Sequence, residues 1–191
     1  MRLRGSSKGS EVTWIIIIFA LALVIGPVAY MLPSARDRRL AALRAEVLKQ
    51  GGRVKLEWLP KLNAELHERV SAGGQVRDPK VECVRYALPG GKAFEHAPQL
   101  QLLRDADGAW VVDPEVSEVA DPEVRALLEG SAGAFPPDTL ALALIQRDLS
   151  ICWLEKSPAD EAVVAEIYAV LGGLKRQIAD VLAGRSESSS S

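Results

Sequence analysis

The longest apolar run of the chain lies near its N-terminus, where no charged residue falls between Glu11 and Arg36. Its core, Thr13 to Leu32, has twenty residues. As a helix that rises about 1.5 Å per residue, this core would span roughly 30 Å. Trp14 and Tyr30 lie near its two ends, where amphipathic rings prefer the membrane–water interface. The pattern predicts one N-terminal transmembrane helix at residues 13–32.

A cleaved signal peptide is the competing interpretation of this run. Its only well-formed cleavage-like triplet, Ala20-Leu21-Ala22, lies so early that cleavage would leave a second apolar stretch on the mature chain. We therefore predict an uncleaved anchor that follows a short N-terminal tail, residues 1–12. Three cationic side chains precede the anchor and five follow it within fifteen residues: Arg2, Arg4 and Lys8, then Arg36, Arg38, Arg39, Arg44 and Lys49. By the positive-inside rule, this excess predicts a cytoplasmic domain behind the anchor.

The domain behind the anchor, residues 33–184, begins with a predicted amphipathic helix. Ser34 is a good N-cap, and Asp37 is its capping-box partner three residues on. Gly51-Gly52 ends the helix. Its apolar stripe is Leu40, Leu43 and Val47. Because this helix follows the anchor directly, we expect the domain to be held close to the membrane.

The domain also ends with a predicted helix, which has the clearest pattern. Ser157 is the predicted N-cap, Pro158 follows it, and Gly184 is the predicted end. Its apolar stripe is Val164, Ile167, Leu171, Leu174, Ile178 and Val181. This stripe must bury against a sheet or a partner helix. Gly172-Gly173 beside it predicts close packing or a kink.

Between these helices, alternating segments predict strands. Arg53 to Trp58 alternates, and we expect Val54, Leu56 and Trp58 to form the buried face of a half-buried strand. Val81 to Leu88 is a second strand. Lys61 to Val70 is ambiguous and is assigned a short helix, followed by a loop at Ser71-Ala72-Gly73-Gly74.

Two hairpins and one short helix complete the domain. Asp105-Ala106-Asp107-Gly108 joins the apolar segments 99–104 and 109–112 in a predicted hairpin. A short helix starts at Asp121-Pro122 and ends by Gly130. The runs 140–146 and 149–155 predict a second hairpin, with one continuous buried helix as the alternative. The fold class is therefore α+β, with a mostly antiparallel sheet of five or six strands, a long C-terminal amphipathic helix across one face and a disordered tail at residues 185–191.

Composition and charge narrow the class of protein. Hydrophobic residues make up 48% of the chain and charged residues 25%, as in a globular protein, and the net charge of −2 does not indicate nucleic-acid binding. From Arg36 to Lys55, seven cationic side chains stand against two acidic ones, whereas from Leu56 onward thirteen stand against twenty-two. The basic segment is either a collar drawn to anionic lipid or an ordinary solvated helix face.

No motif for a metal or cofactor emerges. The residues His67, Cys83, His96 and Cys152 have the composition of a zinc site, but they lack the paired spacing of zinc ligands. Asp105-x-Asp107-Gly108 resembles the start of a calcium loop, yet the twelfth position is Val116 rather than Glu. Pro89-Gly90-Gly91-Lys92 lacks the Walker spacing. We predict no catalytic, cofactor-binding or metal-binding residue, and no cofactor.

Two other patterns leave alternatives open. Cys83 and Cys152 each fall in a predicted strand; outside the cytoplasm they would pair as a disulfide, and inside it they would be reduced core residues. A thiol enzyme that uses one of them requires a depressed pKa in a cleft beside His67 or His96. The segment from Asp105 to Glu129 holds eight acids and one arginine, and is either a docking face for a basic partner or a solvated surface.

The N-terminal fifth of the chain combines the apolar span and Pro33 with the basic segment Arg36-Asp37-Arg38-Arg39, and Gly51-Gly52 precedes Val54-Lys55-Leu56. This layout resembles the YajC family of accessory subunits of the bacterial preprotein translocase. The whole chain is also similar to uncharacterised single-span envelope proteins of proteobacteria. The resemblance implies a bacterial inner-membrane location with the domain in the cytoplasm, rather than a role in secretion.

These observations favour a non-enzymatic, membrane-tethered protein-interaction module. The expected partners are the lipid bilayer and an unidentified protein, and no nucleic acid. An accessory subunit of a membrane complex such as the translocase is one alternative, and a thiol-dependent enzyme is another. The sequence leaves the oligomeric state open.

Overall fold

The computed structural model describes residues 8–31, 34–62, 64–65, 67–71, 73–117, 121–156 and 160–188, with side chains at 13–25 in the first helix and up to 185 in the last. The helices are α1 (Lys8–Met31), α2 (Ala35–Lys49), α3 (Pro122–Ser131) and α4 (Glu161–Ser188), with short 3-10 turns η1 (Gly91–Phe94) and η2 (Ala132–Ala134). The strands are β1 (Arg53–Pro60), β2 (Lys80–Pro89), β3 (Leu100–Arg104), β4 (Trp110–Val112), β5 (Thr139–Ile145) and β6 (Asp148–Trp153). The predicted α+β class is confirmed.

The chain divides into two compact units, Met1–Arg39 and Leu40–Ser191. In the first unit, the large apolar side chains of α1 from Trp14 to Ile25 are all between 42% and 69% exposed. Within the described residues, no helix combines the length and the apolar character needed to cross a membrane. The transmembrane helix at residues 13–32 therefore stays a prediction.

The second unit is built on one six-stranded sheet with the order β1-β2-β6-β5-β3-β4. Every pair of neighbouring strands is antiparallel. This confirms the predicted strand number and orientation. β1 and β4 are the two edge strands.

Local turn chemistry sets both predicted hairpins. Asp105 Oδ1 accepts hydrogen bonds from the backbone N–H groups of Asp107 and Ala109, and Gly108 has a φ of +84°. Between β5 and β6, Gln146 and Arg147 have φ values of +52° and +68°, as a two-residue primed turn requires. The second apolar pair is thus a hairpin, and the alternative of one continuous helix is wrong.

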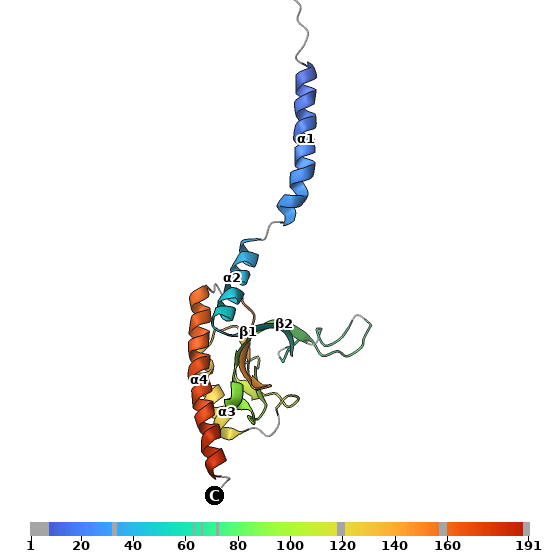
Figure 1. Cartoon of the computed structure of the whole chain (residues 1–191). Coiled ribbons are helices and arrows are strands. Elements are labelled where there is room, and N and C mark those ends of the chain that lie inside the picture. Colours follow the sequence, from blue (N-terminus) through green and yellow to red (C-terminus); the bar gives the residue numbers. More distant parts are fainter. Residues whose placement is uncertain are drawn as a thin grey trace, which may run out of the picture. The chain divides into compact units, whose positions relative to one another are not determined.

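The main core lies on one face of the sheet, which α2, α3 and α4 cover (Figure 1). Leu43 and Val47 of α2 are fully buried, as the helical stripe predicted. The rings of Tyr86 and Trp153 meet edge to face at 5.6 Å between centroids. The predicted stripe of α4 supplies Val164, Ile167, Leu171, Leu174 and Ile178 to the same core.

The helix caps agree with the sequence in two cases and differ in one. Ser34 and Asp37 exchange hydrogen bonds at the start of α2, and Asp121 accepts from Glu123 N and Val124 N at the start of α3. At the start of α4, Asp160 Oδ1 accepts from the backbone N–H groups at positions 162 and 163. The described cap is therefore Asp160, and the predicted cap Ser157 lies outside the described residues.

The predicted helix end at Gly184 and the predicted close packing at Gly172-Gly173 are both wrong. The helix passes Gly184 and continues to Ser188, so Gly184 does not end it, and residues 189–191 lie outside the described part. Arg185 pairs with Asp121 of the α3 cap. A side chain added at Gly172 or Gly173 would meet no neighbouring atom within 4 Å, so these glycines permit no close approach. Likewise α3 runs one residue past Gly130.

Two further predictions fail around β1. Leu56 and Trp58 are 56% and 61% exposed, so the expected buried face of this strand is largely open. The described residues between β1 and β2 contain no helix; instead Val70 and Val76 form an isolated antiparallel bridge. This connection projects away from the rest of the sheet (Figure 1).

Candidate interaction site

Edge strand β1 presents two different faces and an unpaired edge. Its register with β2 places Val54 opposite Tyr86, Leu56 opposite Val84 and Trp58 opposite Glu82. Since directly opposite residues share a face, this row points to the helix-covered side of the sheet. The cover is incomplete there: Val54 is half-buried, whereas Leu56 and Trp58 are exposed.

The other face of the sheet carries a chain of polar contacts centred on Arg85 in β2. Its guanidinium donates from Nε to Glu57 of β1, from Nη1 to Ser150 Oγ of β6 at 2.7 Å and from Nη2 to Gln101 Oε1 of β3 at 3.0 Å. Gln101 Nε2 donates in turn to Asp113 Oδ2 at 2.7 Å. Arg85 is 9% exposed, and a buried guanidinium is tolerated because its donors are matched.

Small side chains make room for this network. Ala143 lies between Ser150 and Gln101 in the strand register, and it is fully buried. The network crosses β5 because an alanine stands at that position. The network bears on function only indirectly. Arg85 holds the Glu57 carboxylate, which lies on the outer face of edge strand β1.

The two cysteines lie on this same face and are both free thiols. Cys83 is 2% exposed and Cys152 is fully buried. The hydrogen bond with Cys152 lowers the pKa of Cys83, while the same bond and burial raise the pKa of Cys152. Cys83 Sγ also donates to the Glu57 carbonyl at 3.5 Å.

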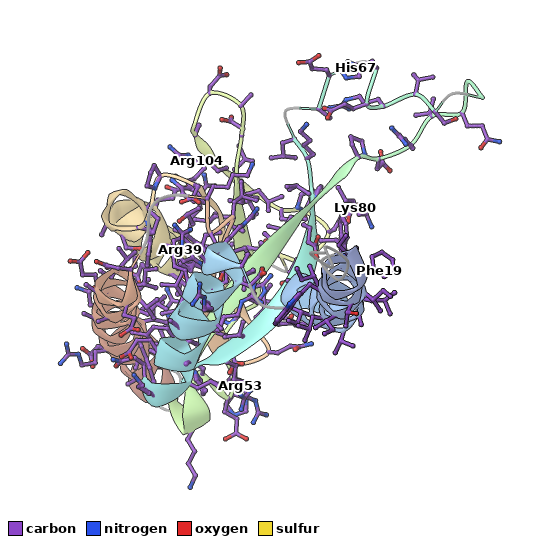
Figure 2. The ribbon with its side chains drawn as sticks, turned by 90° about the horizontal axis from the view of Figure 1, so that it is seen from above. Phe19, Arg39, Arg53, His67, Lys80 and Arg104 are labelled. Atoms are coloured by element: carbon purple, nitrogen blue, oxygen red, sulfur yellow. The ribbon has the colours of Figure 1, made fainter. Side chains whose placement is uncertain are left out.

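The histidines lie on other elements than the thiols. His67 is in the projecting connection between β1 and β2, with Nδ1 3.1 Å from Glu65 Oε2 (Figure 2). His96 is exposed and follows η1. The depressed pKa that a thiol enzyme requires is therefore present at a buried cysteine rather than in a cleft beside a histidine. Among the described residues, no group of three His, Cys, Asp or Glu side chains is placed to hold a metal.

A pocket of about 410 Å³ lies on the outer face beside β1. Its lining includes Lys55 and Glu57 of β1, Arg85 of β2 and the start of β6, where Asp148 pairs with Arg53 at 3.1 Å. The charged groups of this pocket are thus largely matched to one another. The pocket offers a polar surface next to the edge strand.

The acidic segment from Asp105 to Glu129 was considered as a docking face. Its carboxylates largely form hydrogen bonds and ion pairs within the domain. Asp105 holds its turn, Asp113 accepts from Gln101, and Glu129 pairs with Arg125 at 2.7 Å. Asp121 and Glu123 both pair with Arg185. These internal contacts favour the structural interpretation of the segment over the docking one. A groove of about 950 Å³ between η1, α3 and α4 is lined by the same Asp121–Arg185 pair.

Comparison of the chain with family models, with curated proteins and with solved structures finds no match in any of the three. The sequence interpretation missed the network around Arg85, although one signal was present. Arg85 is the one charged residue between Cys83 and Leu88, and a cation in an apolar stretch of a strand needs buried partners.

Proposed function

We propose that this chain is a non-enzymatic, membrane-tethered module that binds an extended polypeptide along β1. One observation carries the binding part: β1 is an edge strand whose apolar row, Leu56 and Trp58, is more than half exposed. An open edge offers backbone N–H and C=O groups to an added strand, and an exposed apolar row gives that strand side chains to pack against. The Glu57–Arg85 contact ties the side chain of Glu57 in β1 to β2.

A photo-crosslinking side chain placed at Leu56 tests the binding edge. In cells, we expect an adduct with another polypeptide at this position. The matched control is Val111 on the opposite edge strand β4, which is 37% exposed and belongs to a strand of only three residues. Adducts at Val111 in place of Leu56 would move the binding edge away from β1.

The membrane part of the proposal rests on the uncharged run between Glu11 and Arg36 and on the exposed apolar surface of α1. A helix that is apolar on all sides needs an apolar environment, and a bilayer supplies one. Replacing Ile18 and Leu21 by Asp should release the full chain from membranes under carbonate extraction, because each buried charge costs roughly 2.5–3.5 kcal/mol at the centre of a span. Leu48→Asp, at an exposed leucine outside α1, should leave the chain in the membrane fraction.

The orientation is tested with Gln75→Cys, an exposed position in the connection between β1 and β2. Because the native cysteines are buried, an impermeant thiol reagent should label only the new thiol in the folded protein. A cytoplasmic domain in a bacterial inner membrane predicts labelling after the cells are opened and none before. Labelling in intact cells would place the domain on the outer side.

An accessory subunit of a membrane complex is the second candidate. It is favoured by the succession of a basic helix, a glycine turn and a strand, formed by α2, Gly51-Gly52 and β1, the elements on which the YajC resemblance depends. Recovery of translocase subunits with the full chain in mild detergent would support this candidate, and their absence would favour a freestanding module.

A further inference from the structure

We propose that β1 pairs in antiparallel fashion with β1 of a second copy of this chain, with a twofold axis at Leu56. The pairing would join the two six-stranded sheets into one continuous sheet. This inference rests on the proposed role of β1 as a binding edge, and it names the partner. It follows from the register and the charges of the strand.

β1 alternates regularly between polar and apolar residues from Arg53 to Trp58, six of its eight residues. On one face lie Val54, Leu56 and Trp58, and on the other lie Arg53, Lys55 and Glu57. Two copies related by a twofold axis bring like faces together, since an isologous interface matches the same patch on both subunits. The apolar rows of the two copies would therefore form one row across the junction.

The charges of β1 favour a single register for this pairing. With Leu56 opposite its own copy, Lys55 lies opposite Glu57 of the other copy, twice by symmetry, and Val54 lies opposite Trp58. Moving the twofold axis by one residue, to position 55 or to position 57, puts Lys55 opposite Lys55 or Glu57 opposite Glu57. Like charges directly opposite each other are destabilising, and opposite charges or aromatic–β-branched pairs are stabilising.

The pairing would also cover two exposed apolar side chains of β1. Trp58 is 61% exposed and Leu56 is 56% exposed, although both sit on the apolar face of a strand. In the proposed pair, each Trp58 ring packs beside Val54 of the other copy, and the Leu56 side chains meet on the axis. The exposed apolar row of one copy is thus covered by the same row of the other copy. The pairing also satisfies the unpaired backbone groups of β1, which could otherwise pair with any extended chain.

Single cysteines in the full chain test the register, with the wild type as control because its own thiols are buried. Leu56→Cys should form a disulfide-linked dimer under mild oxidation, since antiparallel partners have Cα atoms about 4.5–5.5 Å apart, within disulfide reach. Lys55→Cys should not form one, because the two Lys55 positions are offset by two residues along the strands, which places their Cα atoms beyond the roughly 7 Å that a disulfide can bridge. Crosslinking at Lys55 instead of Leu56 would overturn the proposed register.

A charge variant tests the interface without a covalent bond. Lys55→Glu places like charges opposite each other twice, and it should weaken dimerisation of the full chain in detergent roughly tenfold. Lys92→Glu, an exposed lysine on η1, is the matched control and should leave the dimer unchanged. Equal dimerisation of the Lys55→Glu variant and the wild type would overturn the proposal.

The outcomes also separate this inference from the proposed function. A chain that stays monomeric while a crosslinker at Leu56 captures a different polypeptide would overturn the self-pairing and keep β1 as the binding edge. A chain that stays monomeric and captures nothing at Leu56 would overturn both. Dimers linked through Leu56 support both.

Discussion

At the scale of single residues, Glu155 joins three elements of the domain. It follows the end of β6, its backbone has a φ of +51°, and it is 4% exposed. Its carboxylate accepts from Arg44 Nη2 of α2 at 2.9 Å and from the Tyr86 hydroxyl of β2 at 2.6 Å. The first helix of the domain is therefore held to the sheet by a buried charge as well as by apolar packing.

Glu155→Gln tests this contact. The amide keeps the size of the side chain but loses the charge, so the hydrogen bonds weaken and Arg44 loses its counter-charge. We expect the free energy of unfolding to fall by about 1–3 kcal/mol, measured by urea titration of the full chain in detergent. Glu129→Gln, which breaks the exposed helical pair with Arg125, should cost less than about 0.5 kcal/mol. Similar losses in the two variants would contradict the role given to Glu155.

At the scale of elements, glycine has opposite roles in two places. At Gly52, after α2, an added Cβ would overlap the ring of Tyr168, so only glycine lets the chain pass there. At Gly172 and Gly173, inside α4, an added Cβ would meet nothing within 4 Å. The α4 glycines therefore weaken the helix without serving a contact within the described residues.

Replacing both α4 glycines by alanine should stabilise the domain. Each substitution removes the backbone entropy cost of glycine in a helix, about 0.5–1 kcal/mol. The rise should be visible as a higher urea midpoint. Gly52→Ala is the contrasting variant and should lower the midpoint because the new methyl group displaces Tyr168. Destabilisation by the α4 alanines would show that this part of α4 packs against something that a methyl group disturbs.

At the scale of the whole molecule, the two faces of the sheet have different chemistry. The helix-covered face buries the apolar core together with the hydroxyl-bearing rings of Tyr86 and Tyr168. Burial raises the pKa of Tyr86, and its hydrogen bond to Glu155 raises it further; burial also raises the pKa of Tyr168, whose hydroxyl donates to the Ala87 carbonyl. The folded chain therefore holds these two protons more tightly than the unfolded chain does.

Alkaline pH should destabilise the fold for this reason. Each tyrosine contributes fully to the free energy of unfolding below its ordinary pKa of 10. This contribution is lost as the pH rises above 10, because the unfolded state then releases the proton while the folded state still holds it. Tyr168→Phe should reduce the fall in unfolding free energy by about 1.4 kcal/mol per pH unit above about pH 10. Leu171→Val, a destabilising change without a titrating group, should keep the wild-type slope. An unchanged slope in Tyr168→Phe would contradict the raised pKa.

The sequence by itself determined the features that depend on a few neighbouring residues. The Ser34–Asp37 and Asp121 caps, the Asp105–Gly108 turn and the apolar stripe of α4 were all predicted, because a cap or turn is satisfied by atoms two to four positions away. The α+β class followed from the order of these elements. The span at residues 13–32 stays a prediction from composition.

Only the tertiary structure decided which alternating strand is covered and which polar residues meet. The pattern of β1 equals that of a covered strand, but its place at the sheet edge leaves Leu56 and Trp58 open. Arg85 and Gln101 are sixteen positions apart, and Arg85 and Ser150 sixty-five, so their contacts exist only once strand order is set. Alternation in the sequence shows only that one face of a strand is apolar. The packing of distant elements decides whether anything covers that face. In β1 the apolar face is largely uncovered, and this exposed face is the candidate site.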